Sequence, residues 1–163
     1  MKKKALAILV LLSTVTLFGA NILQDAIDKA PAGSILKLPA GTYKGSIHID
    51  KPLSIIGVDD GVIIDGLGEG TVVKVSSSYV TLKNLTIINS GDRHENIDAA
   101  ITLNDASQCE ISNCVIKDCL FGIDMQMVHN SIIAHNHISS KDVELGLRGD
   151  GLRLWYSNDN IIK

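Results

Sequence analysis

The sequence has little positive charge and few aromatic residues. Its 163 residues include 15 Lys and Arg against 18 Asp and Glu, a formal net charge of −3 at pH 7. Proteins that bind nucleic acid usually carry a basic patch or stripe. The sequence has neither, so we do not expect nucleic acid as the partner. Phe, Trp and Tyr make up 4% of the residues, yet Ile, Val and Leu are frequent enough for one domain-sized core.

Long apolar runs are absent after the first twenty residues. The chain opens with MKKKALAILVLLSTVTLFGA, in which three lysines precede an apolar run that ends near Phe18. This order is typical of a secretory signal peptide, and the run is short for a membrane span of roughly 20 residues. We therefore predict a signal peptide over residues 1–20, cut after Ala20, and an exported protein. Because Phe18 fits the small-x-small rule poorly, a shifted cut and an uncleaved anchor are the alternatives.

Cysteines are few, and their number is odd. Cys109, Cys114 and Cys119 follow the signal peptide, so in an oxidising compartment they cannot all pair within one chain. We interpret them as small buried apolar residues, which free cysteines often are. Ligation of a soft metal is the alternative.

Short alternating segments recur along the chain. SIHI, VVKV, AITL, GIDM and GLRL align so that their first apolar residues form a column: Ile47, Val73, Ile101, Ile123 and Leu152. A second column follows two positions later: Ile49, Val75, Leu103, Met125 and Leu154. Both columns should face a shared interior, because successive side chains of a strand point to opposite faces. The residues between them should face water: His48, Lys74, Thr102, Asp124 and Arg153.

A second set of segments aligns independently. YVTLKNLTI, QCEISNCVI and NSIIAHNHI give two more apolar columns: Leu82, Ile111 and Ile133, and Ile87, Ile116 and Ile138. From Ile101 in the first set and from Leu82 in the second, equivalent residues lie 22 or 29 positions apart, so a 22-residue unit carries seven extra residues in alternate turns. The extra residues fall in SGDRHENIDA and SSKDVELGLRGD, which are polar and loop-like.

A repeating unit of this length, with no helix to carry a crossover, indicates an all-β, right-handed, single-stranded parallel β-helix. Equivalent residues then stack about 4.8 Å apart. A β-sandwich is the alternative, but it would not repeat the same columns at one fixed spacing. We predict the coils over residues 34–163.

The one convincing helical segment precedes the coils, at NILQDAIDKAPAGS. Its apolar stripe and the following Pro31 predict a short helix over residues 21–33, with the stripe formed by Ile22, Leu23, Ala26, Ile27 and Ala30. We expect it to cover the N-terminal end of the solenoid, since an uncovered end is an exposed sheet edge.

Asparagine is predicted in two kinds of position. Asn89, Asn104 and Asn113 are expected at corners, where Asn tolerates turn backbones. Asn136 instead falls in the inward column of Leu85 and Cys114. We expect it to be buried and bonded to the backbone.

The last residues, GLRLWYSNDNII, predict the start of another coil. Ile162 follows Ile133 by the longer of the two spacings, where the next member of that column belongs. Because this coil does not close and no capping sequence follows, we expect an N-terminal part of a longer solenoid.

These segments resemble β-helix proteins of the carbohydrate-binding and sugar-hydrolase type. LQDAIDKAPAGSILKLPAGTYKGSIHIDKPLSIIG is similar to their first segment, and GDGLRLWYSNDNIIK resembles the coils of the NosD family more than those of pectate lyases. The likeness covers residues 21–163. NosD proteins are periplasmic accessory proteins that help to assemble the copper centres of nitrous-oxide reductase. The resemblance therefore implies a non-enzymatic periplasmic protein whose partners are nitrous-oxide reductase, the membrane subunit of an ABC-type transporter and a copper chaperone.

Soft-metal ligands gather in the middle of the chain. Copper(I) prefers thiolate, thioether and imidazole groups, and the candidate copper ligands are Cys119, His94, His135 and His137. Met125 and Met127 of MQMVH, like Cys109 and Cys114, align with inward columns, so we expect these four residues to pack in the core. His135 and His137 flank the inward Asn136 and are expected to point outward near one another, with an ordinary surface corner as the alternative.

Cys119 falls at a corner whose neighbouring coils both carry an insertion. The two long loops should rise on either side of its coil, roughly 10 Å apart, and form a trough. We expect Asp118 and Cys119 in the floor of the trough, and the sides formed by His94 and Glu95 and by Asp142 and Glu144. Two solvated loops above a half-buried thiol are the alternative.

A polysaccharide-cleaving enzyme is the competing class. Such a site needs grouped carboxylates with an arginine or lysine nearby, and Asp92, Arg93, Glu95, Asp98 and Asp124 could supply pieces. The column neighbours of Asp124 are Thr102 and Arg153, however, so a stacked pair of carboxylates is not predicted. A third class is a non-catalytic carbohydrate-binding solenoid, for which exposed aromatics would be favourable. Only Trp155 is expected to face outward.

Overall fold

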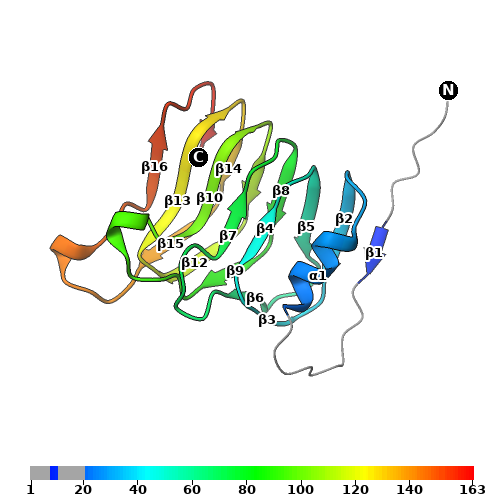
Figure 1. Ribbon diagram of the computed structural model, residues 1–163, viewed down its shortest axis with the longest axis horizontal. Helices are drawn as coiled ribbons and strands as arrows, with labels where there is room; N and C mark the ends of the chain where they lie inside the picture. Colours follow the sequence, from blue (N-terminus) through cyan, green and yellow to red (C-terminus); the bar gives the residue numbers. More distant parts are fainter. Residues whose placement is uncertain (1–7, 11–20) are drawn as a thin grey trace.

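The chain winds into a solenoid of three parallel sheets. The computed structural model describes residues 8–10 and 21–163, and Figure 1 shows the strands stacked side by side from the N-terminal helix to the last coil. From residue 34 onward, successive strands belong to different sheets, and every described strand pair is parallel. This pairing confirms the predicted parallel β-helix and rules out the β-sandwich.

Each full coil contributes one strand to each sheet. Sheet A contains β1 (Ile8–Val10), β2 (Ser34–Leu38), β5 (Leu53–Gly57), β8 (Val80–Lys83), β11 (Glu110–Ser112), β14 (Ile132–Ala134) and β17 (Ile161–Ile162). Sheet B contains β3 (Gly41–Lys44), β6 (Val62–Asp65), β9 (Thr86–Ile88), β12 (Val115–Cys119) and β15 (His137–Ser140). Sheet C contains β4 (Ile47–Ile49), β7 (Val73–Val75), β10 (Ala99–Ser107), β13 (Phe121–His129) and β16 (Leu152–Trp155).

The strand register confirms the predicted columns. In sheet C, Ile123 pairs with Ile101 and with Leu152, which reproduces both the shorter and the longer spacing of the repeat. In sheet A, Ile133 pairs with Ile111 and with Ile162. The inward residues of the inner coils are buried in one continuous core, because a period-2 strand presents one face to the interior.

Two positions depart from strict alternation. Asn104 lies within β10 and not at a corner, and the next residue, Asp105, takes the left-handed backbone, with φ of 49°. Met127 is 45% exposed and does not pack in the core. Its φ of 53° turns the chain, so that Val128 becomes the inward residue. Asn89 and Asn113 have left-handed backbones, as predicted for corners.

The predicted capping helix is present but shorter than expected. Helix α1 spans Ile22–Lys29, and the side chain of Asn21 caps it by accepting from the backbone N–H of Gln24. Ala30 already has extended dihedrals, because the residue before a proline disfavours the helical region. The buried stripe of α1, Leu23, Ala26 and Ile27, joins the main core, whereas Ile22 is exposed.

Side chains of one coil bind the backbone of the coil before it. Asn136 accepts from the backbone N–H of Cys114 at 2.9 Å and donates to the carbonyl of Ile111 at 2.9 Å. Its backbone bonding is as predicted, although the side chain is half-buried. Asn160 makes the same pair of bonds at a different corner, with Ser131 and Val128. Such bonds satisfy backbone groups at corners, where the ladder of the sheet is interrupted.

The two predicted insertions form loops on the same side of the solenoid. The first loop, residues 89–98, joins β9 to β10 and contains the 3-10 turn η1 (His94–Asn96). The second loop, residues 141–151, joins β15 to β16 and contains η2 (Leu145–Leu147). Figure 1 shows both turns projecting from one edge of the coils.

The predicted signal peptide lies largely outside the described residues. Only β1 is described within residues 1–20, and its backbone pairs with β2 at the edge of sheet A. Across residues 8–10 and 21–163, no helix has the length and apolarity needed to cross a membrane.

Candidate functional site

The outer face of sheet C carries a polar groove of about 410 Å³. Its floor consists of outward side chains from four adjacent strands: His48 on β4, Lys74 on β7, Thr102 and Asn104 on β10, and Asp124 and Gln126 on β13. One side is formed by Gly70 and Thr71 together with residues of the first loop, Arg93, Asn96, Ile97 and Asp98. The volume is in the range of sites that hold one small molecule.

Asp124 is buried in this groove, although its column was predicted to face water. The side chain points outward between Thr102 and Arg153, yet the residue is only 1% exposed. Arg153 donates from Nη1 to Oδ1 at 3.3 Å, and Gln126 donates from Nε2 to Oδ2 at 2.6 Å. A buried carboxylate requires such partners, and these two residues also cover it.

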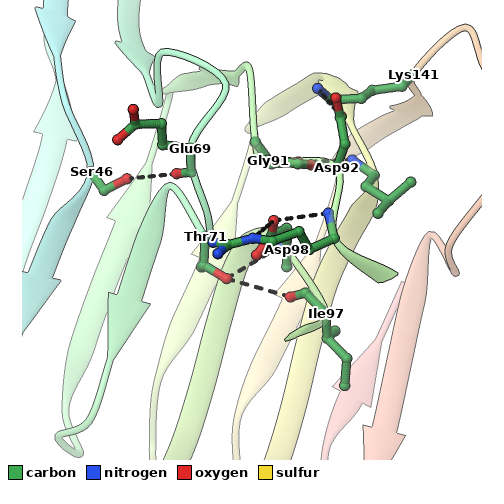
Figure 2. Close-up of polar contacts among 12 residues, drawn as sticks. Ser46, Glu69, Thr71, Gly91, Asp92, Ile97, Asp98 and Lys141 are labelled. Carbon is green, nitrogen blue, oxygen red and sulfur yellow. Dashed lines mark hydrogen bonds and ion pairs between the residues drawn. The ribbon is translucent and has the colours of Figure 1, made fainter. Parts of the chain in front are cut away.

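A second buried carboxylate, Asp98, holds the first loop against the groove. Its Oδ2 accepts from the backbone N–H of Arg93 at 3.0 Å and from Nε of the same residue at 3.2 Å. Thr71 lies beside it and accepts from the N–H of Ala99 at 3.2 Å. Figure 2 shows Thr71, Asp98 and Ile97 together at this side of the groove. Asp98 therefore stabilises the conformation of the first loop, because one of its carboxylate oxygens accepts both hydrogen bonds from Arg93.

The expected trough between the two loops is filled by a small second core. Phe121, Leu120 and Ala99 are buried together, and Ile97 of the first loop and Val143 of the second pack on them. The His94 ring also contacts Phe121, with 5.0 Å between ring centroids. Phe121 follows shortly after the predicted floor residues, and because its large ring turns toward the loops, no open trough remains.

An ion pair joins the two loops above this second core. Lys141 Nζ lies 2.6 Å from Oδ1 of Asp92, as Figure 2 shows. The Asp92 side chain is largely exposed, and exposed ion pairs contribute about 0–1 kcal/mol. The apolar cluster, rather than this pair, should account for most of the loop–loop attachment.

The three cysteines are buried and free of disulfides, as the inward columns predicted for Cys109 and Cys114. Cys119 is 1% exposed, so it is an interior residue and not the floor of a trough. Its Sγ lies 3.4 Å from the carbonyl of Lys117. Burial raises the pKa of Cys119 to about 11, and burial likewise raises the pKa of Cys114 to about 11. Both thiols are therefore protonated at neutral pH, whereas metal ligation uses the thiolate.

The four candidate copper ligands lie in different settings. Cys119 is interior, and His94 is on the first loop against Phe121. His135 and His137 are exposed at the corner that leads into β15. Among the described residues, no three His, Cys, Asp or Glu side chains form a group suited to a metal ion. Copper binding by Cys119, His94, His135 and His137 stays a prediction, and the buried thiol does not fit it.

Exposed aromatic and cationic groups continue from the groove onto the last coil. Trp155 is 54% exposed and lies in register with Gln126. The guanidinium of Arg153 sits 5.5 Å from the centre of the Trp155 ring, and Tyr156 meets that ring edge-on. The outward position of Trp155 is as predicted, but Tyr79 and Tyr156 are exposed as well.

The sequence columns located the floor of the groove but missed its wall. The polar column already brought His48, Lys74, Thr102, Asp124 and Arg153 onto one face. The role of Gln126 and Asn104 could have been found by extending that column by two positions along each strand. The first loop is held over this face by Asp98 and Thr71. These two residues lie in different coils and belong to none of the repeated columns, so the sequence pattern does not point to them.

Solved structures with the same fold include polysaccharide-active enzymes. The alginate lyase from Paenibacillus sp. str. FPU-7 superposes with a TM-score of 0.62 at 18% identity, over 86% of this chain and 61% of the lyase. A pectin methylesterase in complex with a hexasaccharide superposes with a TM-score of 0.55 at 15% identity, over 92% of this chain and 62% of the esterase. Identities this low show the fold alone.

Two curated proteins are similar in sequence. The "Probable ABC transporter binding protein NosD" of Stutzerimonas stutzeri is 28% identical over 126 residues, 73% of this chain. The protein of the same name from Pseudomonas aeruginosa is 28% identical over 133 residues, 77% of this chain. The matches cover 28% and 30% of these relatives, so the chain spans about a third of their length.

The family assignment follows from the coils themselves. Residues 54–163, which run from the third strand of sheet A to the last residue, match the family model described as "Right handed beta helix region". The chain belongs to this right-handed β-helix family.

Proposed function

We propose that the protein is a non-enzymatic periplasmic accessory protein of the NosD type, which helps to assemble the copper centres of nitrous-oxide reductase together with an ABC-type transporter and a copper chaperone. The observation that carries the proposal is the 28% identity to two NosD proteins across about three quarters of this chain. The names of these relatives mention an ABC transporter, which supports that partner.

A non-enzymatic role is supported by the state of the two buried carboxylates in the groove. A general base needs an oxygen free to take a proton from the substrate. In Asp124, both oxygens already accept hydrogen bonds, from Arg153 and Gln126. In Asp98, Oδ2 accepts twice from Arg93 and only Oδ1 has no such donor among the described residues, so the groove does not offer two free carboxylates. These contacts suit binding better than paired-carboxylate hydrolysis.

We propose direct copper contact at His135 and His137, two of the four candidate ligands. Both imidazoles are exposed, and imidazole is a suitable copper ligand. Two ligands alone would hold copper weakly, which suits transfer to a partner rather than storage. Changing His135 and His137 to Ala should weaken Cu(I) binding in competition with a colorimetric chelator, whereas Cys119→Ala should leave it unchanged.

We place the protein–protein contact at the tip of the second loop. Leu145 is 82% exposed and Leu147 is 58% exposed on η2, and apolar side chains gathered at an exposed site can contact a partner protein. Changing both to Ser should impair complementation of a deletion strain. Leu67→Ser is the matched control, because Leu67 is 56% exposed at a corner on another part of the surface.

The decisive experiment measures the product of assembly. Nitrous-oxide reductase is purified from cells with and without the gene, and its copper content and visible spectrum are compared. Reductase from the deletion strain should lack its catalytic copper centre. Unchanged copper loading would refute the accessory role.

A further inference from the structure

The first coil of the solenoid presents one strand edge for each sheet. These edges belong to β2 in sheet A, β3 in sheet B and β4 in sheet C. An edge strand carries backbone N–H and C=O groups that need a partner, and natural proteins cover such edges. Helix α1 packs against β3 and β4, and Figure 1 shows it at this end of the stack. The helix therefore covers two of the three sheets.

Side chains of α1 take the place of a neighbouring strand at the edge of sheet C. The Gln24 amide accepts from the backbone N–H of His48 at 2.7 Å and donates to the carbonyl of the same residue at 3.1 Å. Asn21 donates from Nδ2 to the carbonyl of Ser46 at 2.7 Å. Among the described residues, no side chain of the helix makes such a bond to the backbone of β2.

The edge of sheet A is covered by a strand instead. β1 runs parallel to β2, with Leu9 opposite Leu36, and β2 pairs with β5 on its other side. β1 lies within the predicted signal peptide, residues 1–20. Removal of that peptide takes away the neighbour of β2 and leaves the helix contacts of sheets B and C in place. The outer side of β2, which faces β1, is called the β2 edge below.

From these contacts, we propose that the β2 edge is a strand-binding site, which β1 occupies before residues 1–20 are removed and which an extended aliphatic segment of a partner protein occupies afterwards, parallel to β2. The sequence of β1, ILV, indicates the chemistry of the partner segment: consecutive aliphatic residues without charge. In strand addition, backbone hydrogen bonds supply affinity and alternate side chains supply selection. The proposal rests on the predicted cleavage, and it adds a contact distinct from the tip of the second loop.

The binding test uses the full chain and a labelled peptide with the sequence of residues 2–13, KKKALAILVLLS. Leu9→Pro in the full chain should free the β2 edge, because proline cannot donate within a strand ladder. Fluorescence anisotropy should show peptide binding to this variant and at least about tenfold weaker binding to the wild-type full chain, whose own β1 competes intramolecularly. The chain recovered after export and cleavage should bind like the variant. A peptide that carries the same proline substitution is the control and should not bind.

Two measurements locate the peptide on β2. Bound peptide should slow amide hydrogen exchange in β2 of the Leu9→Pro chain. In that background, Ile35→Lys should weaken binding about two- to fivefold, the range of one cross-strand side-chain contact. Thr81→Lys is the matched control, because Ile35, Ser54 and Thr81 form one column of sheet A and Thr81 lies two strands from the edge. It should bind the peptide with unchanged affinity.

Four results would each overturn the proposal. These are equal binding of the proline-substituted peptide, exchange protection in β17 rather than β2, equal affinity in the Ile35→Lys and Thr81→Lys chains, and a cleaved chain that dimerises and no longer takes up the peptide. Copper loading of nitrous-oxide reductase does not enter this test, so the failure of strand binding and the failure of the accessory role can be told apart.

Discussion

Replacing Arg153 by Met should destabilise the protein through Asp124. The substitution keeps most of the apolar stem of the side chain and removes the guanidinium, whose Nη1 lies 3.3 Å from Asp124 Oδ1. The Asp124 side chain is 1% exposed, so water cannot readily replace the lost partner. Gln126 remains as the other donor, at 2.6 Å.

The expected loss is about 2–3 kcal/mol of unfolding free energy, somewhat below the about 3–5 kcal/mol that removing one partner of a buried ion pair typically costs. Two features reduce the value here: the Arg153 side chain is 27% exposed, so the pair is partly hydrated, and Gln126 still donates to the carboxylate. The double variant Asp124→Asn, Arg153→Met removes both charges and should lie within about 1 kcal/mol of the wild type.

Urea unfolding followed by circular dichroism measures these differences. The slope of free energy against urea must stay constant, because a change would indicate that the last coil unfolds separately. Arg148→Met is the matched control, since Arg148 is exposed and donates only to the carbonyl of Val143. It should cost about 0.5 kcal/mol or less. The reasoning is wrong if Arg153→Met behaves like this control, or if the double variant is as unstable as the single one.

Three further perturbations test the core, the loops and a corner. The buried thiols of Cys114 and Cys119, with pKa values raised from 9.0 to about 11, should resist a thiol reagent at pH 8 until the protein unfolds. Since the unfolded chain loses these protons first, stability should fall as the pH rises from 9 toward 11, by up to about 3 kcal/mol for each thiol. Urea unfolding should show a shallower fall for Cys119→Ala, and rapid labelling of the native protein would contradict the burial. Phe121→Ala should cost about 3–4 kcal/mol and speed proteolysis within both long loops; unchanged cleavage would argue against loop attachment through this ring. Asn136→Leu should cost about 2 kcal/mol in urea unfolding, because two backbone partners at 2.9 Å lose their bonds, and a neutral result would mean that water replaces them.

The coils could be predicted because their signal is repeated. Each column residue, such as Ile101 or Ile133, is constrained both by alternation along its strand and by its equivalents one coil away. Met127 shows where this fails. A single left-handed residue reverses the inward and outward faces beyond it, and the apolar pattern alone does not reveal which residue takes that backbone.

The metal-site hypothesis shows a different limit. The order of the coils places Cys119 close to the two polar loops, but it does not show whether the thiol faces the interior or the solvent. In the structure, Cys119 points inward and Phe121 turns outward to fill the space between the loops. Of the histidines in that hypothesis, His94 lies on the first loop, whereas His135 and His137 lie at the corner that leads into β15.

The sequence by itself determined the period, the strand register and the residues that share each face, because the same alternation of inward and outward residues recurs in every coil of a parallel stack. Only the tertiary structure decided the groove. Its wall depends on the ion pair between Asp98 and Arg93. Its floor depends on Arg153 and Gln126, which cover Asp124. Its net charge depends on Lys74, which forms no ion pair among the described residues. These contacts join side chains on different strands, loops and coils, and their energies depend on burial, which emerges only when the chain is folded.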